Sequence, residues 1–261
     1  MKKILAMLLV LTMVLAFAAC EPAAPAPTGT TTTPSTSSTP TTSNTDPNKV
    51  LTYAEYAAIE VTQGGAQVPV VIEFYVQATQ SWWDNKITVY GQDRDGGYFV
   101  YEMACTQEDA SKLVPGTKIR VKGFKTVWEG EYELASGATF EFVEGADTYI
   151  AEAFDATALL GTDDLIKHQN KLVTFKGLTI KSISYKGGAA GDDIYVNVTN
   201  GDKEFSFCVE RYLTAPDTDV YKAFVDYAVG EGDVVDITGF LYWYQGPNTH
   251  ITSIALSPDV G

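Results

Sequence analysis

The chain has 261 residues, of which 45% are hydrophobic and 20% are charged. It carries 18 basic and 33 acidic residues, which gives a formal net charge of −15. Such a surface repels phosphate backbones unless basic residues are gathered on one face, so the composition disfavours a general nucleic-acid-binding protein. The 15 Tyr, 12 Phe and 4 Trp supply enough large apolar side chains for a packed core.

The N-terminus has the layout of an export signal. Two lysines precede an almost unbroken apolar run over residues 4–17, which is short for a membrane-spanning helix. The following Phe17-Ala18-Ala19-Cys20 resembles the lipobox of bacterial lipoproteins, although that motif prefers an aliphatic residue at the position of Phe17. The resemblance implies that residues 1–19 are a lipoprotein signal peptide and that Cys20 is lipidated. The alternatives are a retained anchor and an ordinary secretory signal.

Residues 20–49 read as a tether. From residue 21 to about residue 48 the chain is almost entirely Ala, Pro, Thr and Ser, without an aromatic or a large aliphatic side chain. Such a segment buries too little apolar surface to offset the entropy lost on ordering, so we expect it to be disordered. With a lipid on Cys20, the tether would hold the remaining chain away from the extracytoplasmic face of the cell membrane.

The rest of the chain is predicted to be mainly β. Alternating patterns and turn residues predict strands at 70–78, 86–92, 97–104, 116–124 and 132–143, with a lead-in helix at 53–60 and a helix at 106–113 between the third and fourth strands. Thr106 is placed to cap that helix. A second set follows, with strands at 172–183, 193–199, 203–209, 232–240 and 250–256, a lead-in at 156–169 and a helix at 219–229.

The two sets are copies of one arrangement. Each has three strands, a helix and two strands, and each fourth strand begins at a glycine and ends in Gly-Phe, at Gly123-Phe124 and Gly239-Phe240. This order resembles the OB-fold, a five-stranded Greek-key barrel with a helix between strands three and four. We therefore expect two tandem OB-fold domains at 50–147 and 152–261, similar to secreted bacterial OB-fold modules. The alternative is a single β-sandwich of about ten strands.

Two cysteines lie within these copies. An exported protein permits a disulfide, but Cys105 and Cys208 occupy similar places in two different copies. We expect both to be buried, unbridged thiols.

A ligand site is expected in the first copy, because OB-folds bind on the face of strands two and three and in the loops beside it. The side chains of that region suited to binding are Trp82, Trp83, Lys86, Tyr90, Arg94, Tyr98 and Tyr101. Adjacent tryptophans beside a turn cannot both enter one core, so one of them would offer a stacking surface for a base or a sugar. The alternative is a hydrophobic plug beneath the lead-in helix.

Basic residues on the fourth strand of the first copy form a second candidate. Arg120 and Lys122 share an outward face with Lys118, which would suit a polyanion. A solvated strand face with lysines that discourage edge pairing is the competing interpretation. The second copy has Asp236 and Thr238 at the matching places, so the two copies would not bind one ligand alike.

Catalysis finds little support in the sequence. His168 and His250 are the only histidines, and neither belongs to a metal-ligand or nucleophile motif. We expect no catalytic residue, metal or cofactor. The sequence favours a monomeric, surface-anchored lipoprotein that acts as a non-enzymatic binding or interaction module for an oligosaccharide, a nucleic acid or a protein. The alternatives are a single-stranded nucleic-acid or oligosaccharide binder that assists an extracellular hydrolase, and a hydrolase of unrecognised type.

The anchor can be tested directly. Cells fed a fatty-acid probe are expected to label the wild-type chain, because a lipobox cysteine is acylated, and Cys20→Ser is expected to abolish the label. The measurement is in-gel detection of the probe. A label that persists in Cys20→Ser would remove the lipoprotein assignment.

Overall fold

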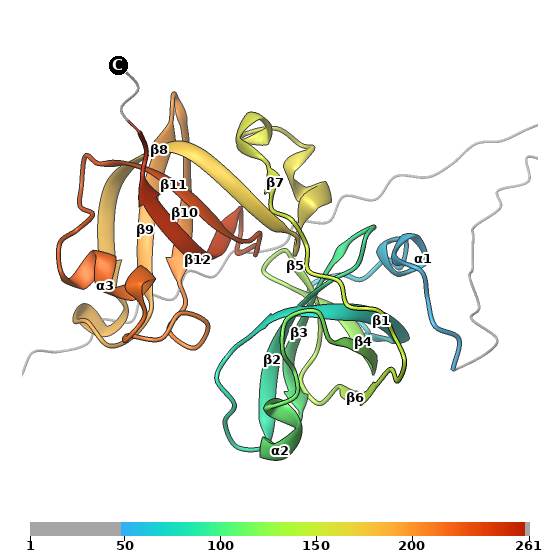
Figure 1. The fold of residues 1–261 in the computed structure, drawn as a ribbon. Helices are drawn as coiled ribbons and strands as arrows, with labels where there is room; N and C mark the ends of the chain where they lie inside the picture. The colour runs from blue at the N-terminus through green and yellow to red at the C-terminus, as the bar shows by residue number, and fades with distance from the viewer. Residues whose placement is uncertain (1–47, 259–261) are drawn as a thin grey trace, which may run out of the picture. The chain divides into compact units, whose positions relative to one another are not determined.

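The computed structural model describes residues 48–258 (Figure 1). The predicted signal peptide, Cys20 and the tether up to residue 47 lie outside the described residues. Within residues 48–258, no helix is both long enough and apolar enough to cross a membrane.

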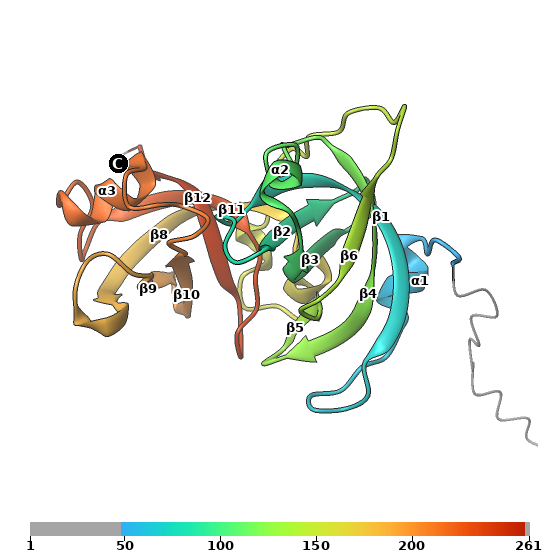
Figure 2. The ribbon, with the colours of Figure 1, turned by 90° about the horizontal axis from the view of Figure 1, so that it is seen from below.

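The first sheet closes into a barrel. Its strands are β1 (Val68–Thr79), β2 (Lys86–Gln92), β3 (Gly97–Ala104), β4 (Lys118–Trp128), β5 (Glu131–Leu134) and β6 (Thr139–Phe142). β1, β2 and β3 form an antiparallel meander, β3 pairs in parallel with β5, and β4 joins β5 back to β1. β5 and β6 both pair with β4, β5 with its C-terminal part and β6 with its N-terminal part. The long strand β4 curves beside β1 (Figure 2). The short helix α2 (Gln107–Ala110) separates β3 from β4, and the Thr106 side chain caps it as predicted.

The second sheet repeats this order. It contains β8 (Leu172–Tyr185), β9 (Ile194–Asn200), β10 (Lys203–Val209), β11 (Val234–Phe240) and β12 (Asn248–Leu256), with β7 (Phe154–Asp155) beside β8. β8, β9 and β10 form the meander, β10 pairs in parallel with β12, and β11 joins β12 to β8. The helix α3 (Asp219–Val225) lies between β10 and β11. The prediction of two five-stranded OB-fold barrels is confirmed by this strand order.

The segments that precede the two barrels differ. The first is the helix α1 (Tyr53–Ala57), which Thr52 and Glu55 begin with a reciprocal capping box. The second contains two separate 3₁₀ turns, η1 (Thr157–Leu159) and η2 (Leu165–His168), in place of the single helical stretch expected at 156–169. A third 3₁₀ turn, η3 (Lys186–Gly188), lies between β8 and β9.

Each barrel encloses its own core. Alternate residues of β1, among them Ile72, Phe74 and Val76, are fully buried in the first core, as period-two alternation requires. Phe175, Phe207 and the helix residue Phe224 belong to the second core. Both predicted free thiols are confirmed, since Cys105 and Cys208 are buried and unbridged.

The outer face of β2 and β3 in the first barrel is covered by the second barrel. The rings of Tyr90 and Phe240 stack with centroids 4.6 Å apart, and Phe99 completes this third apolar cluster. The Tyr90 hydroxyl lies 2.7 Å from Nδ1 of His250. At Gly97 an added Cβ would lie 2.2 Å from the carbonyl carbon of Asn170, so the two backbones meet closely there. The second barrel therefore covers the part of this face around Tyr90 and Phe99, whereas Tyr101 on the same face of β3 stays 43% exposed.

This interface explains why the two Gly-Phe sequences behave differently. Phe124 is 51% exposed, whereas Phe240 at the matching position is 2% exposed. Both follow a glycine in a fourth strand, but β11 ends at Phe240 whereas β4 continues to Trp128. Only Phe240 packs on the other barrel, against Tyr90 and Phe99. The same Gly-Phe sequence therefore gives a buried ring in one barrel and an exposed ring in the other.

The matched pair of phenylalanines tests the interface. Phe240→Ala is expected to lower the free energy of unfolding by about 3–5 kcal/mol, because it leaves a cavity against Tyr90. Phe124→Ala serves as the control and is expected to cost less than about 1 kcal/mol. Urea denaturation of the full chain measures both values. Equal losses in the two variants would contradict the assigned interface.

Candidate functional site

A surface groove of about 500 Å³ runs where the β1–β2 loop, α2 and the segment between β10 and α3 meet. It combines aromatic, amide and hydroxyl side chains with a few aliphatic ones, and none of its lining residues is charged. The lining residues are Thr79, Gln80, Ser81, Trp82, Ile87, Gln107, Ala110, Ser111, Tyr212, Leu213, Ala215 and Thr218. Both barrels contribute to it, so the groove is composite.

Trp82 forms one aromatic wall of the groove. The indole is half-buried against the first core, and its Nε1 donates to the carbonyl oxygen of Cys105 at 2.9 Å. That bond fixes the ring without using a groove residue. Gln80, on the same loop, donates from Nε2 to the Tyr90 hydroxyl at 3.1 Å. Trp82 therefore packs on the first core and also lines the groove next to α2, whereas the predicted plug lies beneath the lead-in helix α1.

Tyr212 is the second aromatic residue of the lining and comes from the second barrel. Its side chain is 48% exposed, and the guanidinium of Arg211 lies 4.9 Å from the ring centroid. The Tyr212 carbonyl accepts from the Ser81 backbone N–H at 2.7 Å, which ties the two walls together across the barrels. The groove is thus built on hydrogen-bonded backbone rather than on free loops.

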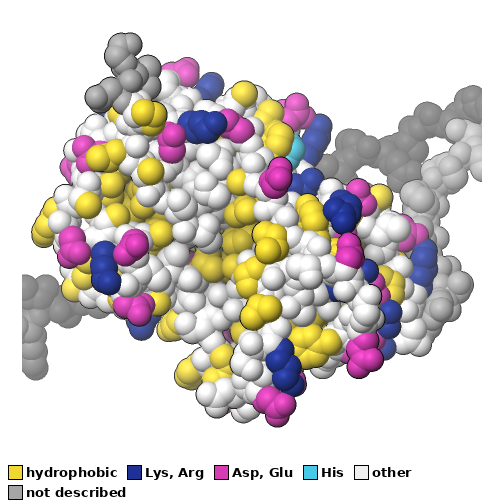
Figure 3. All heavy atoms as spheres, viewed as in Figure 1, with side chains coloured by type: hydrophobic (Ala, Val, Ile, Leu, Met, Phe, Trp, Pro, Cys, Tyr) yellow, Lys and Arg dark blue, Asp and Glu magenta, His cyan; other side chains and the backbone are white. Residues whose placement is uncertain are grey.

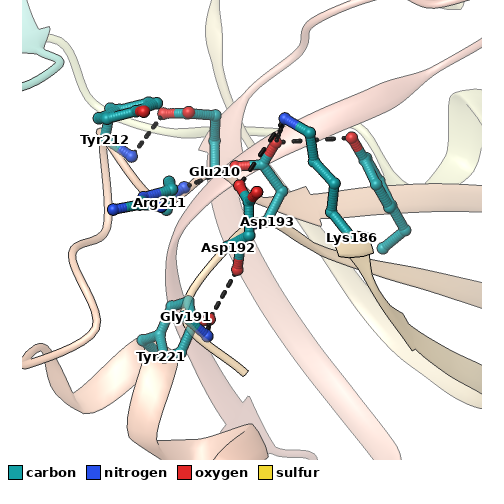
Figure 4. A network of polar contacts seen from close by, with 9 residues as sticks. Lys186, Gly191, Asp192, Asp193, Glu210, Arg211, Tyr212 and Tyr221 are labelled. Carbon is teal, nitrogen blue, oxygen red and sulfur yellow. Dashed lines mark hydrogen bonds and ion pairs between the residues drawn. The ribbon is translucent and has the colours of Figure 1, made fainter. Parts of the chain in front are cut away.

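Two buried carboxylates hold the turn that carries Tyr212 (Figure 4). Glu210 Oε2 accepts from the backbone N–H groups of Tyr212 at 3.0 Å and Leu213 at 2.8 Å. Asp193 Oδ1 accepts from the backbone N–H of Arg211 at 3.1 Å. Both carboxylates are less than one tenth exposed.

The same network ties this turn to the start of β9. Lys186 Nζ lies 3.0 Å from Asp193 Oδ2 and 3.7 Å from Asp192 Oδ1. The hydroxyl of Tyr221, on α3, donates to the Asp192 carbonyl oxygen at 2.6 Å and accepts from the Gly191 backbone N–H at 2.8 Å (Figure 4). These bonds connect the loop before β9 to the helix, so the support beneath the groove spans several elements.

Burial shifts the protonation of several groups at the barrel contact. Burial first, and Asp193 second, raise the pKa of Glu210 to about 7, although the backbone N–H groups oppose this rise. Burial alone raises the pKa of Glu133 to about 7. Burial lowers the pKa of His250 to about 4. Burial therefore brings the pKa values of Glu210 and Glu133 near neutral pH and keeps the His250 imidazole neutral there.

Two of the predicted ligand contacts are buried. Tyr90 and Tyr98 are each 1% exposed. Tyr90 lies against the second barrel, whereas Tyr98 packs inside the first barrel on Phe74 and donates its hydroxyl to Asp93 at 2.9 Å. The prediction that these rings face a ligand is wrong, because neither ring has a free surface.

Three other predicted contacts lie on the surface outside the groove lining. Trp83 is 67% exposed, and Lys86 Nζ lies 5.9 Å from its ring centroid. Lys86 also pairs with Glu102 at 3.1 Å. Tyr101 is 43% exposed on β3. The structure separates these three from Trp82, the one predicted contact that it places in the groove.

The predicted basic contacts are engaged with other groups. Arg120 pairs with Glu73 at 2.7 Å and with Glu141 at 2.8 Å, and Arg94 pairs with Asp147 at 3.4 Å. Lys122 donates to the side chain of Asn48, and Lys118 pairs with Glu73. Figure 3 shows the same pattern more widely, with Lys and Arg side chains lying beside Asp and Glu on that face. Lys118 and Arg120 of the stripe are thus paired with acids, whereas Lys122 bonds a neutral amide. The strand that carries them pairs with β1, β5 and β6, so it is not an edge strand.

Sequence reasoning missed Tyr212 and the amide groups of the groove. Tyr212 lies in an irregular connection, where no periodicity assigns a direction to a side chain. Its one sequence signal is the neighbouring Glu210, an acid that directly follows the buried strand β10. Among residues 48–258, no group of three or more His, Cys, Asp and Glu residues is placed to hold a metal ion.

Comparisons with known proteins give a distant structural similarity. No protein-family model and no curated protein matches the sequence. One similar structure is a murine DNA-binding protein bound to double-stranded DNA. Its sequence is 12% identical to this one, the match spans 74% of this chain and 100% of the murine chain, and the TM-score is 0.36. The Ifi202 HINa domain in complex with a 20-bp double-stranded DNA is 10% identical, with coverages of 74% and 99% and a TM-score of 0.35. Similarity at this level gives no information on the ligand of this chain.

The shifted groups predict how stability varies with pH. Raised pKa values of Glu133 and Glu210 give stability that is full below about pH 4.5 and is lost as the pH rises through 7. The lowered pKa of His250 gives stability that is lost as the pH falls from about 6.5 through 4. Two carboxyls oppose one imidazole, so the free energy of unfolding is expected to fall by about 3 kcal/mol from pH 5 to pH 8.

Urea denaturation at several pH values measures this slope. Glu133→Gln removes one of the two titrating carboxyls and is expected to make the slope shallower. A free energy of unfolding that rises between pH 5 and pH 8 would contradict the assigned burial.

Proposed function

We propose that this chain is an exported lipoprotein, anchored through Cys20, whose two-barrel body binds an uncharged oligosaccharide without catalysis. The observation that carries the proposal is the groove, which sets two aromatic side chains among neutral polar groups and contains no charge. The export signal and the tether support the location of the body outside the cytoplasm.

The chemistry of the groove suits a sugar. A pyranose ring offers apolar C–H faces that pack on aromatic rings such as Trp82 and Tyr212. Its hydroxyls both donate and accept, which is the capacity of the amides of Gln80 and Gln107 and of the serine and threonine hydroxyls. A few placed polar groups within a concave, partly apolar surface are typical of small-ligand sites.

Nucleic acid is the less favoured ligand. Binding to phosphates needs cations, and the groove has none. The basic stripe on β4 is paired with Glu73 and Glu141. The overall charge of −15 adds a general repulsion.

Binding rather than hydrolysis also fits the groove. Glycoside hydrolysis ordinarily uses two carboxyl groups that flank the bond to be cleaved. None of the groove-lining residues is an acid. The nearby Glu210 and Asp193 are buried and accept backbone hydrogen bonds instead.

A glycan array probed with the full chain in detergent micelles tests the proposal. Tyr212→Ala is expected to weaken binding to a selected glycan about 5- to 150-fold, because it removes one aromatic ring whose stacking is worth roughly 1–3 kcal/mol. Trp83→Ala is the matched control, since Trp83 is exposed but does not line the groove, and it is expected to leave affinity unchanged.

Salt and alternative ligands complete the test. Affinity is expected to stay constant from 50 to 500 mM salt, because no ion pair forms. Binding to single-stranded DNA that weakens steeply with salt, together with no glycan binding, would replace the oligosaccharide proposal by a nucleic-acid one.

A further inference from the structure

The backbone at Tyr212 depends on one side-chain oxygen. The Tyr212 N–H donates to Glu210 Oε2 at 3.0 Å, and the Leu213 N–H shares that oxygen at 2.8 Å. Leu213 N also reaches the Glu210 carbonyl oxygen, at 3.0 Å. Tyr212 has the exposed ring that forms one wall of the groove. The carboxyl of Glu210 thus acts on the residue that would contact a ligand.

Among residues 48–258, no Lys, Arg or His forms an ion pair with Glu210. The nearby cation, Lys186, lies on Asp193 and Asp192, and Asp193 repels a charge on Glu210. The titratable and charged groups around Glu210 come from several elements and are Lys186, Asp192, Asp193, Cys208, Arg211, Tyr90 and His250. Burial, a like charge and two backbone donors together bring the charged and neutral forms close in free energy near neutral pH.

The two forms differ in how well they hold the turn. An ionised carboxylate accepts hydrogen bonds roughly twice as strong as those of a neutral acceptor. Protonated Glu210 accepts these hydrogen bonds only weakly. Its added O–H is a further donor beside the Tyr212 and Leu213 N–H groups, which already donate to the same carboxyl. The turn from Arg211 to Thr214 would then lose part of its restraint in a local opening that breaks these two hydrogen bonds and leaves Glu210 buried. Global unfolding, which exposes Glu210 to water, has the opposite pH dependence.

We propose that Glu210 is a positioning residue whose ionised carboxylate holds Tyr212 in the groove, so that ligand binding weakens when Glu210 takes up a proton. The link to ligand affinity rests on the proposed function. The link between Glu210 and the Tyr212 turn rests on the hydrogen bonds alone.

Hydrogen exchange of the full chain tests the turn without a ligand. The protection factor of the Tyr212 amide, which corrects for the intrinsic pH dependence of exchange, is expected to rise about fivefold from pH 5.5 to pH 8.5. Glu210→Gln keeps a neutral acceptor and is expected to give low protection at every pH. Glu133→Gln removes a carboxyl that also titrates near pH 7 but does not contact the turn, so the wild-type profile is expected to remain. A flat wild-type profile, or the same rise in Glu210→Gln, would overturn the proposal.

Affinity for a glycan selected on the array gives the second readout. The wild-type chain is expected to bind about fivefold more tightly at pH 8.5 than at pH 5.5, and Glu210→Gln is expected to lose this dependence. Glycan binding that does not vary with pH would overturn the inference and leave the proposed function intact. Protection that titrates without any glycan binding would remove the proposed function and keep Glu210 as the residue that controls the turn.

Discussion

The packing of the second barrel on strands β2 and β3 of the first is the constraint on which the rest of the structure depends. It buries Tyr90 and Phe99 against Phe240, and it brings His250 within hydrogen-bonding distance of Tyr90. An OB-fold in isolation offers this face to ligands. Here the part of that face around Tyr90 and Phe99 joins the two copies and is closed to a ligand.

The groove arises from this displacement. Its walls come from the first β1–β2 loop and from the turn after β10, and the Ser81–Tyr212 hydrogen bond fixes their relation. Placing aromatic rings on a hydrogen-bonded frame reduces the entropy lost when a ligand binds. The buried pair Asp193 and Glu210 supplies that frame on one side, at the cost of desolvating two acids. The residues that hold the turn, Asp193 and Glu210, are buried acids, whereas the residues that line the groove are uncharged. Different residues therefore support the groove and face a ligand.

The positions of the strands could be predicted from the sequence, but which strand faces are covered by other parts of the chain could not. The ranges 86–92, 97–104 and 203–209 match β2, β3 and β10, because period-two alternation and glycine turns bound them locally. Tyr98 and Tyr90 illustrate the limit. Alternation assigns each ring to one face of a strand, but whether the outer face is open depends on contacts from distant residues such as His250, 160 positions from Tyr90. Tyr212 was beyond reach for the same reason, because its position follows from a turn held by tertiary hydrogen bonds.

The composite groove also has a consequence for inheritance. Neither copy carries both aromatic walls, and each would expose a large apolar face if it stood alone. A duplicated domain is ordinarily free to be lost, shuffled or recombined as a separate unit. In this chain a recombination event that transfers one barrel would transfer part of the groove lining and would expose the apolar cluster of Tyr90, Phe99 and Phe240. The pair would therefore be selected and inherited as one domain.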